Sequence, residues 1–542
     1  MKTFTRLTGF LSLFIFNGAL LLAQPAMIKD IRNGAIGSNF SGLVDVNGVG
    51  FFAADDGGFG LELWKTDGTT AGTVLVKDIN PGINSSGPEE LVNVNGVLYF
   101  TADDSQHGTE LWKSDGTDAG TVMVLDINLT DVSDYTKHKG PSYLRAMSNY
   151  LVFTADDGVN GREVWKSNGT DLTTVLIKDI NTAGGVGSSP SGLTRLGSTF
   201  YFTASDGASG TELWKSDGTT VGTSLVKDIF FGAPGSGPFF LATVGFTLYF
   251  SAYDGGATGV ELWKTNGTTA GTVLVKDINP GAGISGPAYM VNGGGGIVYF
   301  VANDGTRGKE LWKSDGTDAG TVLVKDINPG IADGAPFNLK LIGSTLYFRA
   351  TDGINGVELW KSDGTSGGTV LVKDINSSSG NSNPSYFVLS NGITYFTADD
   401  GTNGTELWQT DGTGNGTTMV SNINPTGSSN PNYLTNVNNV LLFSADDGTN
   451  GLELWTINGS LITSNQFSSD GITKQVSPNP TMGEVTITGV KESETLMVYN
   501  SVGVLINTYH GVETVHVDLS AQSNGVYIVR STEGGFLKII KQ

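Results

Sequence analysis

Short runs of apolar and aromatic residues alternate along the chain with turns rich in Gly, Asn and Asp. Residues 89–128 show one such unit. The segments "EELVNV", "VLYFTADD", "TELWKSDGT" and "GTVMVLDIN" each predict a strand, and Asn95-Gly96 predicts a tight hairpin turn. Because no part of the unit has a helical period, the unit is expected to be a four-stranded antiparallel meander.

The unit repeats around the tryptophans, which are separated by 47 to 53 residues. They are Trp64, Trp112, Trp165, Trp214, Trp263, Trp312, Trp360, Trp408 and Trp455. A period near fifty indicates a radial or stacked array. Runs such as Val97–Ala102 are apolar without clean alternation, which is typical of strands covered on both faces. We therefore predict an all-β propeller of about nine four-stranded blades.

The two ends of the array predict how the ring closes. The ninth unit, "ELWTINGSLITSNQF", lacks a fourth strand, and the N-terminal segment "AMIKDIRNG" resembles the missing one. Met27–Ile31 is therefore expected to pair with Leu454–Asn458 and complete the last blade. The alternative, an open solenoid, would need polar capping units at both ends.

Composition and charge narrow the function. The net charge of −22 opposes binding to phosphate backbones, so no nucleic-acid partner is expected. The chain has no cysteine, which excludes disulfides, a Cys nucleophile and thiolate metal sites. Residues 1–23 carry a positive start and an apolar core, and they predict a signal peptide cleaved between Ala23 and Gln24. No other segment predicts a membrane span, and the mature chain is expected to be a monomer.

Two segments resemble known families. The phrase "ELWKSDGT" and its copies resemble the ELWxxDGT repeat of secreted bacterial proteins, over Met27–Ser460. This resemblance implies an exported propeller-like array and no reaction, and it places the propeller domain at 24–460.

The end of the chain carries the second resemblance. "VSPNPTMGEVTI", "LMVYNSVGVLI" and "VDLSAQSNGVYIVR" resemble the C-terminal sorting domain of the type IX secretion system of Bacteroidota, over residues 476–542. The resemblance implies a small β-sandwich that is recognised by the secretion machinery, and cargo that is secreted or displayed on the surface of a diderm bacterium. Residues 461–475 are expected to be a linker.

Acidic residues recur in every unit. The second Asp of the "DD" pair is found at positions 56, 104, 157, 206, 254, 304, 352, 400 and 447, and a Glu stands two residues before each Trp. Nine equivalent pairs do not provide the unlike carboxylates of an active site. We expect each Asp to hold backbone amides in its turn, and we expect the tryptophans to pack between blades rather than to bind ligand. Calcium binding is the alternative for the carboxylates, although their spacing is not that of a calcium loop.

Local chemistry is expected where the repeat changes. One interval contains Tyr135, Lys137, His138, Tyr143 and Arg145, and another contains Phe230, Phe231, Phe239 and Phe240. Exposed aromatics in such loops favour contact with a sugar or a protein, and simple loop variation is the alternative. No catalytic, cofactor or metal motif is present.

Two function classes follow. The first is an exported non-catalytic protein whose propeller binds a glycan or protein ligand. The second is a secreted hydrolase that uses the central channel of the ring.

Overall fold

The computed structural model describes residues 24–129, 140–256, 258–377 and 379–458, which form the propeller. In the C-terminal region it describes 466–469, 472–477, 481, 483–491, 494–500, 505–510, 513–522, 525–531 and 536–541. The chain divides into two compact units, residues 25–457 and a unit that contains 458–542. The described secondary structure is strands, apart from one 3-10 turn, η1 (Asp171–Thr173).

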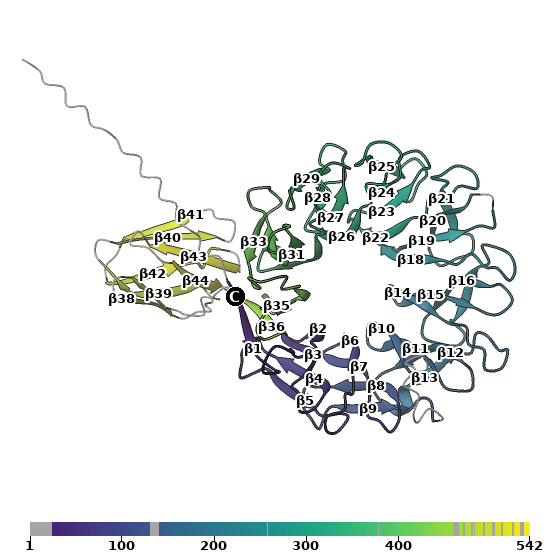
Figure 1. The fold of residues 1–542 in the computed structure, drawn as a ribbon, viewed down its shortest axis with the longest axis horizontal. Coiled ribbons are helices and arrows are strands. Elements are labelled where there is room, and N and C mark those ends of the chain that lie inside the picture. The colour runs from purple at the N-terminus through teal and green to yellow at the C-terminus, as the bar shows by residue number, and fades with distance from the viewer. Residues whose placement is uncertain are drawn as a thin grey trace, which may run out of the picture. The chain divides into compact units, whose positions relative to one another are not determined.

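The propeller consists of nine four-stranded antiparallel sheets arranged as blades in a ring (Figure 1), which confirms the predicted fold and blade number. The first strand of each blade lies nearest the ring axis, and we call these nine strands the inner wall. They are β2 (Ser41–Val46), β6 (Glu89–Val94), β10 (Ser142–Ala146), β14 (Ser191–Leu196), β18 (Phe239–Val244), β22 (Ala288–Asn292), β26 (Phe337–Ile342), β30 (Ser385–Ser390) and β34 (Asn432–Val437).

The remaining strands of each blade follow in order from the inner wall outward. The second strands are β3 (Val49–Asp55), β7 (Val97–Asp103), β11 (Leu151–Asp156), β15 (Thr199–Ser205), β19 (Thr247–Tyr253), β23 (Val298–Asn303), β27 (Thr345–Thr351), β31 (Ile393–Asp399) and β35 (Val440–Asp446). The third strands are β4 (Leu61–Thr66), β8 (Thr109–Ser114), β12 (Arg162–Ser167), β16 (Thr211–Ser216), β20 (Val260–Thr265), β24 (Lys309–Ser314), β28 (Val357–Ser362), β32 (Thr405–Thr410) and β36 (Leu452–Asn458). The outermost strands are β5 (Val74–Lys77), β9 (Val122–Leu125), β13 (Val175–Lys178), β17 (Ser224–Lys227), β21 (Val273–Lys276), β25 (Val322–Lys325), β29 (Val370–Lys373), β33 (Thr418–Ser421) and, for the ninth blade, β1 (Gln24–Lys29).

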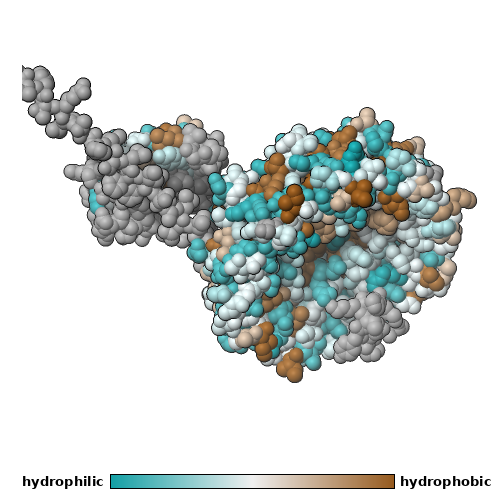
Figure 2. Space-filling model, turned by 45° about the horizontal axis from the view of Figure 1, so that its top comes forward, coloured by the Kyte–Doolittle hydropathy of each residue, from teal (hydrophilic) through white to brown (hydrophobic). Residues whose placement is uncertain are grey.

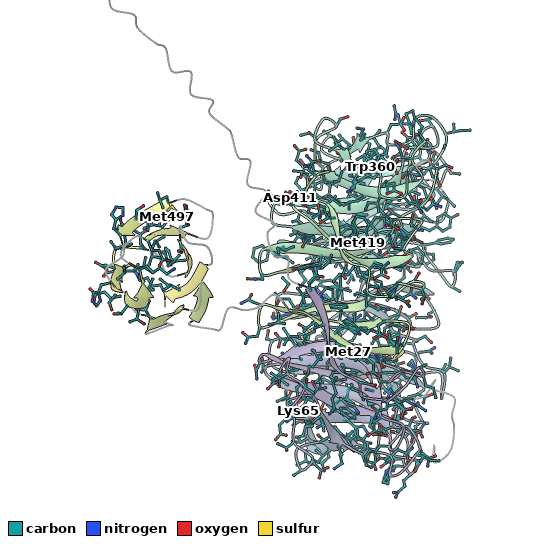
Figure 3. All side chains as sticks on the ribbon, turned by 60° about the vertical axis from the view of Figure 1, so that its left-hand side comes forward. Met27, Lys65, Trp360, Asp411, Met419 and Met497 are labelled. Carbon is teal, nitrogen blue, oxygen red and sulfur yellow. The ribbon has the colours of Figure 1, made fainter. Side chains whose placement is uncertain are left out.

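The N-terminal strand closes the ring, as the sequence predicts. Strand β1 pairs with β36 in the sheet β1-β36-β35-β34, and Figure 3 shows Met27 beside the last blade. The strand begins and ends slightly earlier than the predicted Met27–Ile31. Beyond it, the backbone amide of Ile31 donates to Glu453 Oε2 at 3.0 Å, and Ile31 is buried with Phe52 in the core between the ninth and first blades. The two ends of the propeller segment therefore stabilise one junction.

The core lies between neighbouring blades. In all nine blades a fully buried Phe lies at the centre of the second strand, and it packs against the Trp of the same blade, as Phe100 does with Trp112 and Phe250 with Trp263. Burying one such side chain stabilises the fold by roughly 1.5–3 kcal/mol. In the tight turn at Asn95-Gly96 both residues have positive φ, of 51° and 86°. Two-residue hairpin turns with positive φ match the right-handed twist of the strands that they connect.

The C-terminal unit is made of two four-stranded sheets. One contains β37 (Gln466–Ser469), β38 (Ile472–Ser477), β39 (Glu484–Val490) and β42 (Glu513–Asp518); the other contains β40 (Thr495–Asn500), β41 (Leu505–His510), β43 (Gly525–Ser531) and β44 (Phe536–Lys541). Side chains from both sheets, such as Ile487 and Val498, share one core. The expected linker at 461–475 differs from the structure, because β37 and the first part of β38 pair within this range.

Candidate functional site

The repeated aspartates hold their own turns, which agrees with the scaffold interpretation of the sequence. Asp157 Oδ1 accepts the backbone amides of Val159 and Asn160 at 2.9 and 2.7 Å. Burial raises the pKa of Asp157, but these hydrogen bonds outweigh it, so the pKa lies below its ordinary value. The same two bonds, to residues two and three positions on, recur at Asp56, Asp104, Asp206, Asp304, Asp352, Asp400 and Asp447.

The glutamates before each Trp hold the connection that leads to the next blade. Glu62 is fully buried; its Oε2 accepts the Ile79 amide at 2.8 Å and the Ser86 hydroxyl at 2.6 Å, and its Oε1 accepts the Ser86 amide at 2.8 Å. Burial raises the pKa of Glu62 to about 7, and the Ser86 hydroxyl opposes the shift. These carboxylates therefore fix backbone rather than project toward a substrate.

The tryptophans and lysines join neighbouring blades. Trp214 is buried, and Lys178 of the preceding blade lies with its Nζ 5.9 Å from the Trp214 ring centroid, within cation–π range. The Lys that follows a Trp reaches the other neighbour, as Lys65 Nζ donates to the carbonyl of Gly116 at 2.8 Å. This geometry supports inter-blade packing as the role of the tryptophans.

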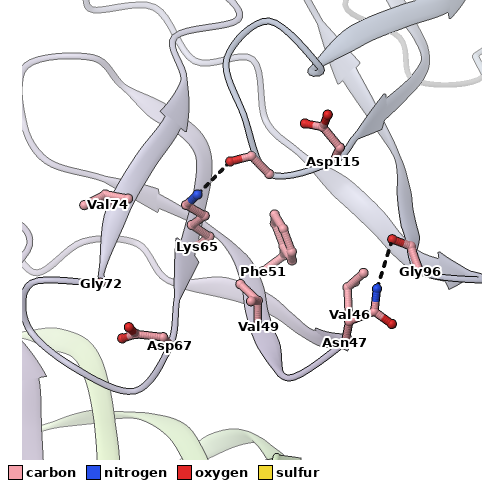
Figure 4. Close-up of a pocket in the computed structure, with 11 residues that line it drawn as sticks. Val46, Asn47, Val49, Phe51, Lys65, Asp67, Gly72, Val74, Gly96 and Asp115 are labelled. Carbon is pink, nitrogen blue, oxygen red and sulfur yellow. Dashed lines mark hydrogen bonds between the residues drawn. The ribbon is translucent and has the colours of Figure 1, made fainter.

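Figure 4 shows a cavity of about 400 Å³ beside that contact, lined by Phe51, Lys65, Asp67 and Asp115 of the first two blades. A similar cavity, lined by Tyr201, Lys215 and Asp217, lies between blades four and five. Since the cavity recurs with the repeat, we interpret it as part of the scaffold.

The structure separates the candidate residues into different places. Tyr135, Lys137, His138 and Ala23 lie outside the described residues, and Gln24 begins β1. Phe231 is exposed in the loop after β17, while Phe230 packs edge-on against Tyr253 with ring centroids 5.4 Å apart. The other four candidates lie on inner-wall strands rather than in the expected loops, because β10 and β18 begin earlier than the sequence pattern suggests. These four are Tyr143 and Arg145 on β10, and Phe239 and Phe240 on β18.

Three of those candidates line one cavity. Arg145, Phe239 and Phe240 enclose about 340 Å³ together with Thr194 and Gly192 of the intervening strand β14. Figure 2 shows the propeller hollowed toward the ring axis. The cavity therefore brings together a cation, two aromatic rings and a hydroxyl from three consecutive blades.

Sequence reasoning missed a ring of strained residues on the inner wall. The second residue of every inner-wall strand has positive φ, between 54° and 67°. These nine residues are Gly42, Glu90, Tyr143, Gly192, Phe240, Tyr289, Asn338, Tyr386 and Tyr433. At this point the inner-wall strand bulges, and its register with the second strand shifts. In β2 the one residue Gly42 is left out of the pairing, and in each of the other eight inner-wall strands two consecutive residues are left out.

Five of the nine are aromatic, although this conformation costs a residue with a Cβ roughly 1–2 kcal/mol and costs glycine nothing. Tyr386 is 52 % exposed and Phe240 is 44 % exposed, so burial of the rings does not compensate for the strain. Strain retained at exposed side chains is characteristic of functional sites. The sequence signal was the aromatic residue that recurs at the second position of five of the nine first strands.

The aromatic residues form a continuous arc over blades five to seven. Ring centroids are 6.5 Å apart for Phe239 and Phe240, 5.3 Å for Phe240 and Tyr289, and 4.4 Å for Tyr289 and Phe337. The guanidinium of Arg349 lies 4.6 Å from the Phe337 ring centroid and ends the arc. We call Phe239, Phe240, Tyr289 and Phe337 the aromatic arc.

The comparisons with known proteins identify the C-terminal region. Residues 475–542 match the model of the secretion system C-terminal sorting domain. This type IX sorting domain indicates export to the cell surface or secretion, and it implies interaction with the type IX machinery. Among the residues that the structure describes, no helix is long and apolar enough to span a bilayer.

Solved structures resemble the chain only distantly. Puromycin hydrolase is 14% identical with a TM-score of 0.35, over 70% of this chain and 61% of that chain. PorZ, a bacterial surface component of the type IX secretion system of Porphyromonas gingivalis, is 12% identical with a TM-score of 0.34, over 93% and 75%. Oligopeptidase B from Leishmania major is 9% identical with a TM-score of 0.40, over 76% and 54%. No curated protein matches the chain.

Proposed function

We propose that this protein is an exported, non-catalytic binding protein whose inner wall contacts a glycan or protein ligand outside the cell. The observation that carries the proposal is the set of exposed aromatic side chains held in a left-handed conformation, such as Phe240, Tyr289 and Tyr386. Large rigid rings supply contact area with little loss of side-chain entropy on binding, which makes them effective anchors for ligands.

The repeated carboxylates support binding rather than hydrolysis. Most glycoside hydrolases need two carboxyl groups in different environments. In most blades of this propeller the second Asp of the pair and the Glu before the Trp have equivalent partners, and those partners are mainly backbone amides. Within the described residues, no three His, Asp or Glu side chains are grouped so that they could hold a metal ion.

The test compares the full chain with two inner-wall variants, Tyr289→Gly and Phe240→Gly, and one control variant on a glycan array and a panel of envelope proteins. Tyr289→Gly removes a ring of the inner wall and also relieves its backbone strain, so the protein should fold and should lose binding. Phe246→Ala is the matched control, because Phe246 is a 90 % exposed Phe in the turn after β18, away from the arc. Binding that survives Tyr289→Gly and Phe240→Gly would refute the proposal. Shortened glycan products would instead favour the hydrolase.

A further inference from the structure

The inner wall of blades three to nine differs in charge from the rest of the protein, whereas the inner-wall strands of blades one and two carry Asp45, Glu89 and Glu90. The chain has a net charge of −22, yet the inner-wall strands of blades three to nine contain no Asp or Glu. The same strands carry Arg145, Arg195 and Lys340. An electropositive surface inside an acidic protein attracts anions and steers them toward the ring axis.

Arg349 breaks the repeat at the end of the aromatic arc. Its position on β27, opposite the first residue of the inner-wall strand, is uncharged in the other blades. Those equivalents are Ala53, Thr101, Thr154, Thr203, Ser251, Val301, Thr397 and Ser444. Arg349 is partly buried over Phe337, and no carboxylate of the described residues lies within salt-bridge distance of it. A partly buried cation without a counter-ion is unfavourable until an anion binds.

The aromatic arc lies between Arg349 and a second cation, Arg145. Phe239 and Phe240 form one wall of the cavity that also contains Arg145, and Phe337 at the other end carries Arg349. Two guanidinium groups therefore stand at the two ends of four adjoining aromatic rings, across blades three to seven. Hydroxyl groups of Ser191, Thr194 and Thr203 line the cavity at the Arg145 end.

The backbone of the inner wall argues against a peptide ligand. One recurring mode of peptide binding adds an extended strand to an exposed sheet edge. Here every inner-wall strand is interrupted at its second residue by a left-handed conformation and a break in register, as at Phe240 and Tyr289. Bulges of this kind prevent continuous strand pairing. Recognition must then come from the side chains, and flat rings with neighbouring hydroxyls suit sugar rings.

We infer that the aromatic arc binds an acidic polysaccharide built of uronic acids. Its sugar rings stack on Phe240 and Tyr289, and its carboxylates pair with Arg145 and Arg349. This inference rests on the proposed function and gives it a ligand class. The inference goes beyond the proposed function because it requires the ligand to carry negatively charged carboxylates.

The experiment measures binding of the purified full chain to polygalacturonate, alginate and hyaluronate, and to the methyl ester of each. Esterification keeps the sugar backbone and removes the carboxylate charge. Arg145→Gln and Arg349→Gln should each weaken binding to the charged polymer about tenfold or more, and should leave the weaker binding to the ester unchanged. Arg307→Gln is the matched control, because Arg307 lies in the turn between β23 and β24, outside the inner wall, and already pairs with Asp304.

Each contrary outcome has a distinct meaning. If the charged polymers bind no better than their esters, or if Arg349→Gln has no effect, the inference is wrong. The proposed function would still stand if a neutral glycan or a protein lost binding with Tyr289→Gly. Tighter binding of polyglutamate than of any uronate would assign the arc to an acidic protein and overturn the glycan assignment. Loss of binding in every variant, including Arg307→Gln, would show damage to the fold, and circular dichroism of each variant separates that case.

Discussion

Replacing Tyr386 tests whether the inner wall is strained. Tyr386 has φ of 57° and a 52 % exposed side chain, so its ring contributes little to the core. In a left-handed conformation a Cβ costs roughly 1–2 kcal/mol, whereas glycine in an ordinary strand costs roughly 0.5–1 kcal/mol relative to alanine. The cost of the Cβ in the left-handed conformation is larger than the cost of the glycine. Tyr386→Gly should therefore be more stable than Tyr386→Ala by about 0.5–1 kcal/mol.

The control lies on the same strand. Leu389 is 45 % exposed and is not among the residues with positive φ. There the order should reverse, with Leu389→Ala more stable than Leu389→Gly by about 0.5–1 kcal/mol. Urea unfolding followed by tryptophan fluorescence measures the four midpoints, and equal slopes make them comparable. If alanine is the more stable substitution at both positions, position 386 is not strained and the argument for a functional inner wall loses its basis.

Four further predictions concern the rest of the molecule. Deleting residues 24–31 should reduce hydrogen-exchange protection in both the first and the ninth blades, because these residues complete the last sheet; loss confined to the first blade would indicate an open array. Burial raises the pKa of Glu62, Glu261, Glu310 and Glu453 to about 7, above the ordinary 4.5. The stability that these groups contribute is therefore complete below about pH 4.5 and is lost as the pH rises through about 7. The urea midpoint of unfolding should fall as the pH is raised over this window. A midpoint that rises with pH would contradict the raised pKa values. A chelator should shift the melting temperature by no more than about a degree, since calcium at a hundredfold excess over its Kd would add about 2.7 kcal/mol per site; a large drop would restore the calcium alternative. Deleting residues 476–542 should prevent surface display, measured by protease accessibility on intact cells, and normal display would refute the sorting role.

Most of the fold could be predicted because the same pattern of strands and turns occurs around each of the nine tryptophans. The Trp period gave the blade number, and the unpaired ninth unit with the N-terminal segment gave the closure that β1 and β36 make. The expected linker failed for a physical reason. Its polar residues lack the alternation that marks a half-buried strand, yet β37 pairs with β38 from Gln466 to Ser469 through its backbone.

The candidate site was only partly predictable. Arg145, Phe239 and Phe240 were found because they change the repeat, but their shared cavity joins residues about ninety positions apart and depends on the packing of three blades. Arg349 was missed because one Arg in a second strand resembles ordinary variation. The strain at Tyr289 and Tyr386 was also invisible, because the sequence of an inner-wall strand does not show which residue takes a positive φ.

The glycines of the inner wall indicate what the aromatic residues add. Gly42 and Gly192 occupy the same left-handed position as Tyr289, so the blade forms equally well without a side chain there. A Cβ at Gly192 would point to Leu241 of the next blade at 3.8 Å, which shows that a side chain at this position lies along the wall toward its neighbour. Where the side chain is a ring, it therefore extends a surface from blade to blade, as Phe240 does toward Tyr289. The cavity at Arg145 lies where Gly192 interrupts that surface. A ligand that follows the arc would meet a recess at this gap, with a cation on one side and two Phe rings on the other. The Gly in its floor distinguishes this recess from the other inner-wall cavity, where the equivalent positions are Tyr386 and Tyr433, beside Lys340.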